Sequence, residues 1–231
     1  MKNIEKLLYF TVVISTCFVA AVGAAEPGSF FASGPRDTNE VSLTFDDGPG
    51  NFTPKILEVL KKYGVKATFF MEGDQVEIRQ KIAKMVVDDG HEVFGHSYSH
   101  PDFYHYKKDD YRQLLSQEID KAGKIIEKIT GIRPIAMRMP YGYVKKQWVK
   151  DVAKEKGYIL INWTFGCDWK KMSGDELAAA YIKNIGPGAI FLMHDGGKGR
   201  APTVEALPKI IEEIQKRGYK IVPAGEMLKL K

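Results

Sequence analysis

The chain of 231 residues contains only two cysteines, Cys17 and Cys167. Cys17 lies in an apolar N-terminal stretch that we expect to be removed on export, so one cysteine remains and no intramolecular disulfide can form. A secreted domain without disulfides has to be stabilised by its hydrophobic core, with or without a metal ion. The composition supplies that core, because 44% of the residues are hydrophobic.

Two further features are missing, and each excludes a class of protein. The 34 lysines and arginines exceed the 29 aspartates and glutamates by too little to suggest a nucleic-acid-binding protein. The sequence also has no glycine-rich phosphate loop of the Walker or dinucleotide type, which argues against a nucleotide-driven enzyme. We therefore expect neither a nucleic acid nor a nucleotide as a partner, and we expect a monomer.

The N-terminus has the features of a targeting segment. Lys2 and Lys6 precede an apolar run from Leu7 to about Ala25, and small residues end that run. This arrangement predicts a secretory signal peptide over residues 1–25 and a protein that is secreted or held in the cell envelope. The alternative is an uncleaved membrane anchor. It is less favoured because the run is barely long enough to span a bilayer and contains hydroxyl side chains.

Residues 26–39 are rich in Pro, Gly and Ser and are predicted to be a linker, whereas residues 40–231 alternate strands and helices. Seven short apolar segments are predicted to be buried strands: Val41–Phe45, Ala67–Phe70, Glu92–Gly95, Ile135–Arg138, Tyr158–Trp163, Ala189–Met193 and Tyr219–Pro223. Most are continuous apolar runs, which suits parallel strands covered on both faces. The pattern predicts a single α/β domain with a parallel sheet, either open or closed into a barrel.

Helical patterns separate several of these strands. Four helices are expected. The first is capped by Thr53 with Pro54 at its first position, and the second has apolar residues from Tyr111 to Ile129 and is ended by Gly131. The third begins with a capping box of Ser173 and Glu176, and the fourth has apolar residues from Leu207 to Ile214.

Ionisable side chains end or follow five of the seven predicted strands: Asp46 with Asp47, His96 with His100, Arg138, Asp168 and His194. Each alone has an ordinary explanation, such as a turn, a surface arginine, a loop ion pair or a buried histidine with satisfied hydrogen bonds. In open sheets and barrels alike, functional residues lie at the carboxyl ends of parallel strands. Their joint presence at one rim therefore favours a catalytic site.

Two of these clusters have the chemistry of a metal site. Adjacent carboxylates at Asp46 and Asp47 repel each other, and a cation or a raised pKa has to relieve that repulsion. If the segment after the third strand makes a helical turn, His96 and His100 stand on one face at i and i+4. That spacing lets two imidazoles hold one metal ion, although an isolated pair of this kind is more often structural.

These residues resemble the polysaccharide deacetylases of carbohydrate esterase family 4, which share the NodB-homology domain. The resemblance covers about residues 40–228 and five ordered motifs: Thr44-Phe45-Asp46-Asp47-Gly48-Pro49, His96-Ser97-Tyr98-Ser99-His100, Arg138-Met139-Pro140-Tyr141, Asp168-Trp169 and Leu192-Met193-His194. It implies a distorted (β/α) barrel. It also implies removal of N-acetyl groups from N-acetylglucosamine units of an acetylated polysaccharide or oligosaccharide, such as peptidoglycan, chitin oligomers or an exopolysaccharide.

The resemblance also implies one divalent metal ion and a role for each motif. Asp47, His96 and His100 would be the metal ligands, which suit zinc and would also accept cobalt or nickel. The remaining implied roles are Asp46 as the catalytic base, Arg138 and Asp168 as the residues that hold Asp46, His194 as the general acid, the backbone N–H of Tyr141 as an oxyanion donor, and Leu192 with Trp169 as a pocket for the acetyl methyl group.

One departure from the family pattern concerns the fourth motif. Members often carry two acidic residues before its Trp, whereas this chain has only Asp168. Two alternative functions share the same residues: an O-acetyl esterase acting on a polymer such as xylan, and a glycan-binding module that has lost turnover. The complete set of base, ligands and acid argues against the second alternative. The sequence does not identify the polymer.

Overall fold

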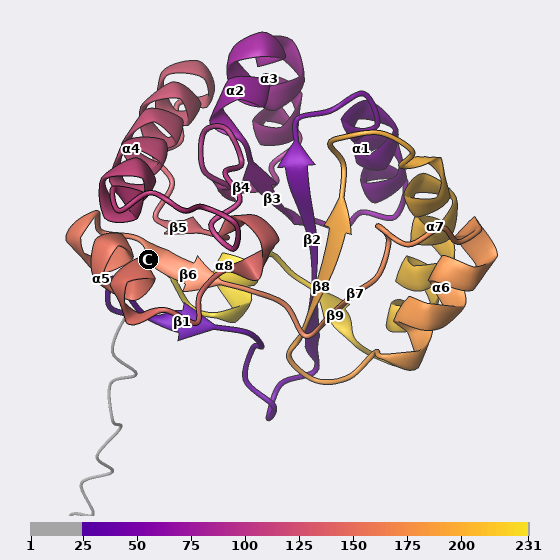
Figure 1. The fold of residues 1–231 in the computed structure, drawn as a ribbon. Coiled ribbons are helices and arrows are strands. Elements are labelled where there is room, and N and C mark those ends of the chain that lie inside the picture. Colours follow the sequence, from indigo (N-terminus) through magenta and orange to yellow (C-terminus); the bar gives the residue numbers. More distant parts are fainter. Residues whose placement is uncertain (1–24, 231) are drawn as a thin grey trace, which may run out of the picture.

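In the described part of the chain, nine parallel strands form one sheet that curls around itself (Figure 1). The computed structural model describes residues 25–230, so the predicted signal peptide lies outside the described residues except for Ala25. The strand order is β1-β6-β5-β4-β3-β2-β8-β7, with β9 beside β2. Within residues 25–230 no pairing joins β1 to β7, and the sheet therefore curls without closing. This arrangement is the distorted (β/α) barrel that the motifs implied.

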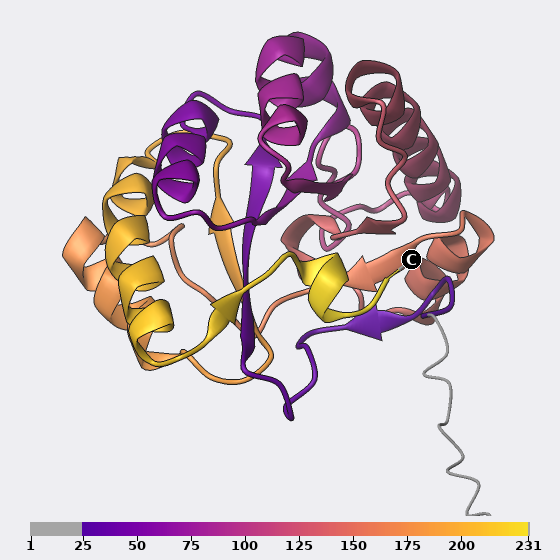
Figure 2. The same cartoon turned by 180° about the vertical axis from the view of Figure 1, so that it is seen from behind.

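All seven predicted strands are present, and several are shorter than expected: β2 (Glu40–Gly48), β3 (Thr68–Met71), β4 (Glu92–Gly95), β5 (Ala136–Met137), β6 (Ile159–Ile161), β8 (Ala189–His194) and β9 (Lys220–Ile221). Two further strands were not predicted, β1 (Phe30–Phe31) and β7 (Phe165–Gly166). β1 pairs with β6, with Phe30 beside Leu160, and the two strands lie side by side in Figures 1 and 2. Part of the predicted linker therefore belongs to the folded sheet.

Seven helices lie around the outside of the curled sheet (Figures 1 and 2), within residues 25–230: α1 (Thr53–Lys62), α2 (Gly73–Ile78), α3 (Gln80–Asp88), α4 (Tyr111–Thr130), α5 (Gln147–Glu155), α6 (Gly174–Lys183) and α7 (Ala201–Lys216). The short helix α8 (Ala224–Met227) lies nearer the middle of the molecule, and its Met227 packs in the inner cluster with Phe70 and Phe94. The four predicted helices are α1, α4, α6 and α7. None of the helices in residues 25–230 combines the length and apolarity that a bilayer span requires.

The predicted helix ends are confirmed at two helices and wrong at a third. α4 ends at Gly131, whose φ of 76° is a left-handed conformation that glycine adopts without strain. Ser173 and Glu176 form the predicted capping box of α6. Thr53 does not cap α1. Its hydroxyl instead donates a hydrogen bond to the buried carboxylate of Asp195, because α1 begins beside the loop after β8.

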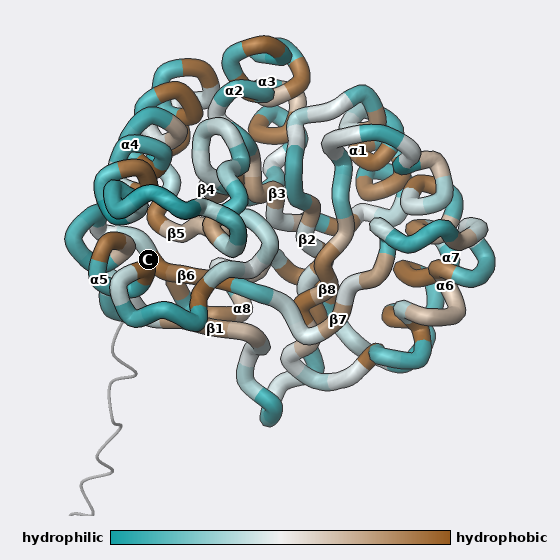
Figure 3. The backbone as a smooth tube through the Cα atoms, viewed as in Figure 1, coloured by the Kyte–Doolittle hydropathy of each residue, from teal (hydrophilic) through white to brown (hydrophobic). Residues whose placement is uncertain are grey.

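Both faces of the sheet are buried, as the continuous apolar runs predicted. Phe69 packs outward in the cluster formed with the outer helices, whereas its neighbour Phe70 packs inward against Phe94, with ring centroids 5.7 Å apart. This alternation follows from the strand geometry, in which successive side chains point to opposite faces. Figure 3 shows the result, with hydrophobic colouring along central strands and hydrophilic residues recurring along the helices.

A buried histidine links the stability of this fold to pH. His91 lies between α3 and β4 with 7% of its surface exposed. Its Nδ1 accepts a hydrogen bond from the backbone N–H of Ala67 at 3.2 Å, which requires an unprotonated nitrogen. Burial, together with the nearby charge of Lys66, lowers the pKa of His91 to about 4.

We predict that protonation of His91 destabilises the protein as the pH falls from about 6.5 towards about 4. In this window the unfolded chain binds a proton that the native protein does not, so protonation favours unfolding. The contribution of neutral His91 to the free energy of unfolding is fully present above pH 6.5 and is lost when the pH falls to about 4. Urea unfolding across this range should show a component on the order of 1–2 kcal/mol.

The part of the pH dependence that comes from His91 is measured by comparison with His91→Asn, which keeps a hydrogen-bond acceptor but does not titrate. Its stability should fall less steeply over the same pH range than that of the wild type. His105→Asn is the matched control, because the His105 side chain is 84% exposed. Equal pH dependence of the wild type and His91→Asn would contradict the assignment.

Candidate active site

The predicted functional residues converge on one pocket at the carboxyl ends of β2, β4 and β8. The pocket has a volume of about 430 Å³. Eight of the ten predicted site residues line it: Asp46, Asp47, His96, His100, Tyr141, Trp169, Leu192 and His194. The other two, Arg138 and Asp168, are buried and bonded to residues that line it. The pocket also contains Arg200, which was not predicted.

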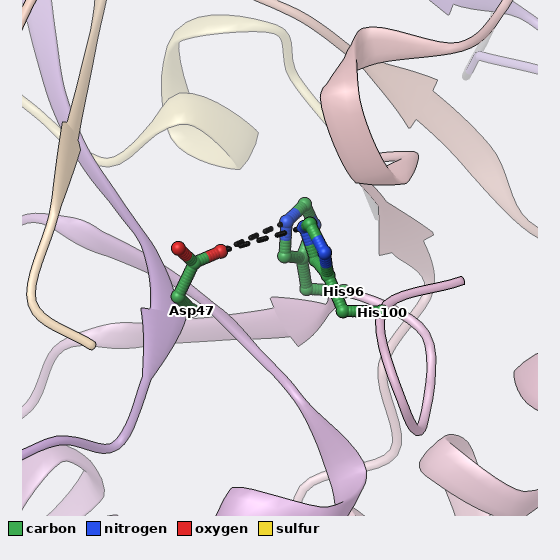
Figure 4. Close-up of side chains that lie close together, drawn as sticks. All are labelled: Asp47, His96 and His100. Carbon is green, nitrogen blue, oxygen red and sulfur yellow. Dashed lines mark ion pairs between the residues drawn. The ribbon is translucent and has the colours of Figure 1, made fainter. Parts of the chain in front are cut away.

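The Asp47 carboxylate points at two imidazoles (Figure 4). Its Oδ1 lies 3.4 Å from Nε2 of His96 and 3.6 Å from Nε2 of His100. One ligand atom from each of the three residues lies within 4.8 Å of the other two. Donor atoms around a tetrahedral zinc, at bond lengths of about 2.0–2.1 Å, lie roughly 3.3–3.4 Å apart. The spacing therefore fits a single ion.

The surroundings of His96 prepare it to be a ligand. Its Nδ1 lies 2.8 Å from the backbone carbonyl of Arg138, so Nδ1 carries the hydrogen and donates it, and the lone pair of Nε2 points at the site. Burial acts to lower the pKa of His96, but Asp46 and Asp47 raise it to about 9. The cluster thus favours a positive charge at its centre, which a divalent cation supplies. A carboxylate with two imidazoles is a donor set that zinc accepts.

The two histidines reach the site from an irregular loop, and the expected helical turn is absent. Ser97 and His100 have φ values of 62° and 53°, in the left-handed region, and this bend brings the two imidazole centroids to 4.9 Å. The loop is held by Glu118 of α4. Its Oε2 accepts hydrogen bonds from the backbone N–H groups of Tyr98 and Ser99 at 2.8 and 2.7 Å.

Glu118 was not among the predicted site residues, although its position on the helix carries a signal. Glu118 is 8% exposed and falls on the buried face of α4 with Leu115, Ile119 and Ala122. A carboxylate on an apolar helix face needs hydrogen-bond donors from another element. That requirement predicts a buried partner, but the sequence does not say which loop supplies it.

Asp46 is held by a buried arginine whose three guanidinium nitrogens all donate hydrogen bonds. Nη1 of Arg138 donates to Oδ1 of Asp46 at 2.6 Å and to the Thr44 hydroxyl at 2.8 Å. The rest of the guanidinium donates to the backbone carbonyls of Ile161 and Asn162, each at 3.0 Å. The second oxygen of Asp46 lies 3.8 Å from Nε2 of His96. The carboxylate is therefore fixed on one side and open to the metal cluster on the other.

Asp168 does not help Arg138 to hold Asp46, and that prediction was wrong. Its Oδ1 lies 2.7 Å from Nδ1 of His194, and its Oδ2 accepts hydrogen bonds from the His194 backbone N–H and the Thr203 hydroxyl at 2.8 and 2.9 Å. The reason is the strand order. Asp168 follows β7, which is the neighbour of the strand that ends in His194, whereas Arg138 follows β5 beyond β2.

This pairing sets the protonation of His194. Burial acts to lower its pKa, but the hydrogen bond and charge of Asp168 raise it above the ordinary value. Since Nδ1 donates to Asp168, Nε2 remains for the pocket. The exposed Trp169 ring lies nearly perpendicular to this imidazole at a centroid distance of 5.9 Å. The raised pKa favours the protonated imidazole, which can deliver its proton to a molecule bound in the pocket.

Backbone strain is concentrated at this pocket. Five non-glycine residues in the described chain have positive φ values, and four of them belong to the site: Asp47, Ser97, His100 and Tyr141. Each such conformation costs about 1–3 kcal/mol and persists only where surrounding contacts enforce it. At Tyr141 it accompanies a 56% exposed ring that packs against His100 at 4.7 Å.

The family model for polysaccharide deacetylase matches residues 33–161. The chain belongs to this family. A peptidoglycan-N-acetylglucosamine deacetylase of Bacillus cereus is 36% identical over 205 residues, which cover 87% of this chain and 73% of that protein. A solved peptidoglycan N-acetylglucosamine deacetylase, in complex with 4-naphthalen-1-yl-N-oxidanyl-benzamide, matches with a TM-score of 0.81 at 35% identity and covers 88% of this chain and 94% of its own.

Fold similarity extends to a relative without activity. A carbohydrate esterase family 4 pseudoenzyme from Bacillus anthracis matches with a TM-score of 0.77 at 35% identity, covering 87% of this chain and 69% of its own. Membership of the polysaccharide deacetylase family therefore does not by itself establish turnover. The case for turnover rests on the base, ligand and acid residues of this chain.

We predict that Asp47→Ala, His96→Ala and His100→Ala each weaken zinc binding by about 100-fold or more, because each removes one of three ligands. Calorimetric titration and metal analysis of the purified protein measure the affinity and stoichiometry. Wild-type affinity should also fall as the pH is lowered, since zinc has to displace the proton that His96 otherwise binds. His105→Ala is the control. Unchanged zinc binding in all three variants would rule out this ligand set.

We predict that Asp168→Asn lowers the pKa of His194 by removing the charge that raises it. If protonated His194 is needed for turnover, the alkaline limb of the rate profile should then move to lower pH. Zinc affinity should change little, because Asp168 bonds to none of the three ligands. A pH–rate profile of kcat and NMR titration of His194 measure the two effects. If the alkaline limb of the pH–rate profile does not move, Asp168 does not control the protonation of the group that acts as the acid.

Proposed function

We propose that the protein is a metal-dependent deacetylase that hydrolyses N-acetyl groups of N-acetylglucosamine units in peptidoglycan. The observation that carries the proposal is the pocket itself, where a carboxylate base, three metal-ligand side chains and an acid imidazole line one space of about 430 Å³. The names of the relatives support peptidoglycan as the polymer. The signal peptide predicted from the sequence supports action outside the cytoplasm, where this polymer lies.

A divalent ion held by Asp47, His96 and His100 would supply Lewis-acid chemistry, which makes water a nucleophile near neutral pH and polarises an amide carbonyl. The Asp46 carboxylate accepts the proton of the attacking water. Arg138 holds this carboxylate through Oδ1 at 2.6 Å, so the base cannot rotate away from the pocket. Attack therefore begins from a pre-positioned base.

His194 completes the hydrolysis. As the bond between the acyl carbon and nitrogen breaks, Nε2 of His194 gives its proton to the departing amine, and acetate and a free amino sugar result. The Asp168 carboxylate orients the imidazole throughout. The backbone N–H of Tyr141 is the candidate donor to the carbonyl oxygen as negative charge develops there. Loss of such a donor costs about 3–4 kcal/mol of barrier lowering.

The apolar wall of the pocket suits the small acetyl group. Leu192 is buried, with 3% of its surface exposed, whereas Trp169 is 52% exposed. Both line the pocket beside His194. We assign them to the acetyl methyl group, while the exposed ring of Tyr141 is available to the sugar.

The test is acetate release from defined acetylated glycans by the purified protein with zinc supplied. Peptidoglycan fragments should yield acetate and an equal amount of new free amine. Asp46→Asn should bind zinc normally yet lose at least about 100-fold in kcat, because it lacks the base. Asp109→Asn, a change at an exposed surface residue, should keep full activity.

Other substrates distinguish the alternatives. Acetate without free amine, released from acetylated xylan alone, would replace the proposal by an O-acetyl esterase. Greater turnover of chitin oligomers or an exopolysaccharide would change the polymer but not the reaction. Polymer binding with no acetate from any substrate would identify a glycan-binding module.

A further inference from the structure

Arg200 is a cation beside the candidate metal site that has no part in the reaction described above. It directly precedes α7, and its guanidinium lines the pocket with 12% of the side chain exposed. Nε donates to the backbone carbonyl of Gly196 at 2.9 Å, and Nη1 donates to that of Asp168 at 3.4 Å. Nη2 lies 3.7 Å from Oδ2 of Asp47.

The two oxygens of Asp47 therefore have different partners. Oδ1 faces Nε2 of both histidines, whereas Oδ2 faces Arg200. The terminal torsion of an aspartate is broad, so a carboxylate without fixed contacts can turn either oxygen towards a ligand site. A guanidinium held by two backbone carbonyls provides such a fixed contact for Oδ2.

We propose that Arg200 is a positioning residue that fixes the Asp47 carboxylate in its metal-binding orientation. The proposal deepens the proposed function and rests on the metal site assigned there. Through its two carbonyl contacts Arg200 also joins that site to the loop after β7, which contains Asp168, and to the loop after β8, which follows His194.

The packing around Gly196 supports this role. Gly196 lies against the backbone of Asp47 so closely that a Cβ atom at this position would overlap the Asp47 carbonyl. The N–H groups of Asp195 and Gly196 also donate to the Asp46 carbonyl at 3.1 and 3.3 Å. The Gly196 carbonyl that anchors Arg200 is thus itself held against the two aspartates, and the guanidinium has a fixed position relative to Asp47.

The charge of Arg200 makes the proposal sharply testable, because its two possible effects on metal binding have opposite signs. A positive charge near a cation repels it, so removal of the charge alone would strengthen zinc binding. Removal of a positioning contact would weaken binding, typically by about 10–100-fold for a residue that orients a ligand. The direction of the change therefore separates the two roles.

The experiment compares Arg200→Met and Arg200→Lys with the wild type by zinc titration against a competing chelator. Arg200→Met should bind zinc about 10–100-fold more weakly. Arg200→Lys should also bind more weakly, because a single ammonium group does not reproduce the planar fork that reaches both carbonyls and Asp47. Lys198→Met is the matched control, since it removes an exposed positive charge from the same loop and should leave affinity unchanged.

A second readout reports on the ligands directly. With cobalt in place of zinc, the visible absorption spectrum depends on coordination geometry, and both Arg200 variants should change it while Lys198→Met does not. Thermal unfolding with chelator present checks that each variant is folded before metal is added.

Stronger or unchanged zinc binding by Arg200→Met would overturn the proposal. Zinc binding by Arg200→Lys as tight as that of the wild type would also overturn it, because a positive charge would then replace the guanidinium without its contacts to the two carbonyls. If the wild type binds zinc and releases acetate, and the Arg200 variants bind zinc as tightly as the wild type, then only the role of Arg200 is refuted and the proposed function stands. A wild type that binds no zinc would refute both.

Discussion

The buried ion pair between Arg138 and Asp46 is the constraint on which the rest of the site depends. Arg138 is fully buried, stacks on Phe70 at 4.0 Å and donates to the Thr44 hydroxyl and to two backbone carbonyls as well as to Asp46. A buried charge is tolerated only when its hydrogen bonds are satisfied in this way. The pair joins the ends of β2 and β5 across the sheet, and the backbone carbonyl of the same arginine orients His96.

The site is built in two halves that share β2. One half contains the three metal-ligand side chains, supported by Glu118 through the histidine loop and by Arg200 beside Asp47. The other half pairs His194 with Asp168 at the end of β8. Because the two halves are separate, the base Asp46 is held by Arg138, and the acid His194 is held by Asp168. Left-handed backbone at the site residues is maintained because these supports act on the loops from several elements.

Much of the fold and most of the candidate site were predictable from local patterns. Continuous apolar runs identified seven strands, and the ionisable residues directly after them identified the rim. The partners were harder to predict. Asp168 was matched with Arg138 because motif order says nothing about which strand ends are neighbours, and β7, a strand of only two residues, was not recognised. Glu118 and Arg200 escaped because their partners are backbone groups and side chains on loops distant in sequence.

The sequence by itself determined the α/β architecture and the residue types that can bind a metal and move protons. These properties depend on periodicity, composition and motif order, which are local. The tertiary structure alone decided which oxygen of Asp47 faces the histidines, which carboxylate serves His194, and how an irregular loop replaces the expected helical turn. Those outcomes depend on the sheet order and on hydrogen bonds between segments far apart in the chain, for which a single sequence carries no distance information.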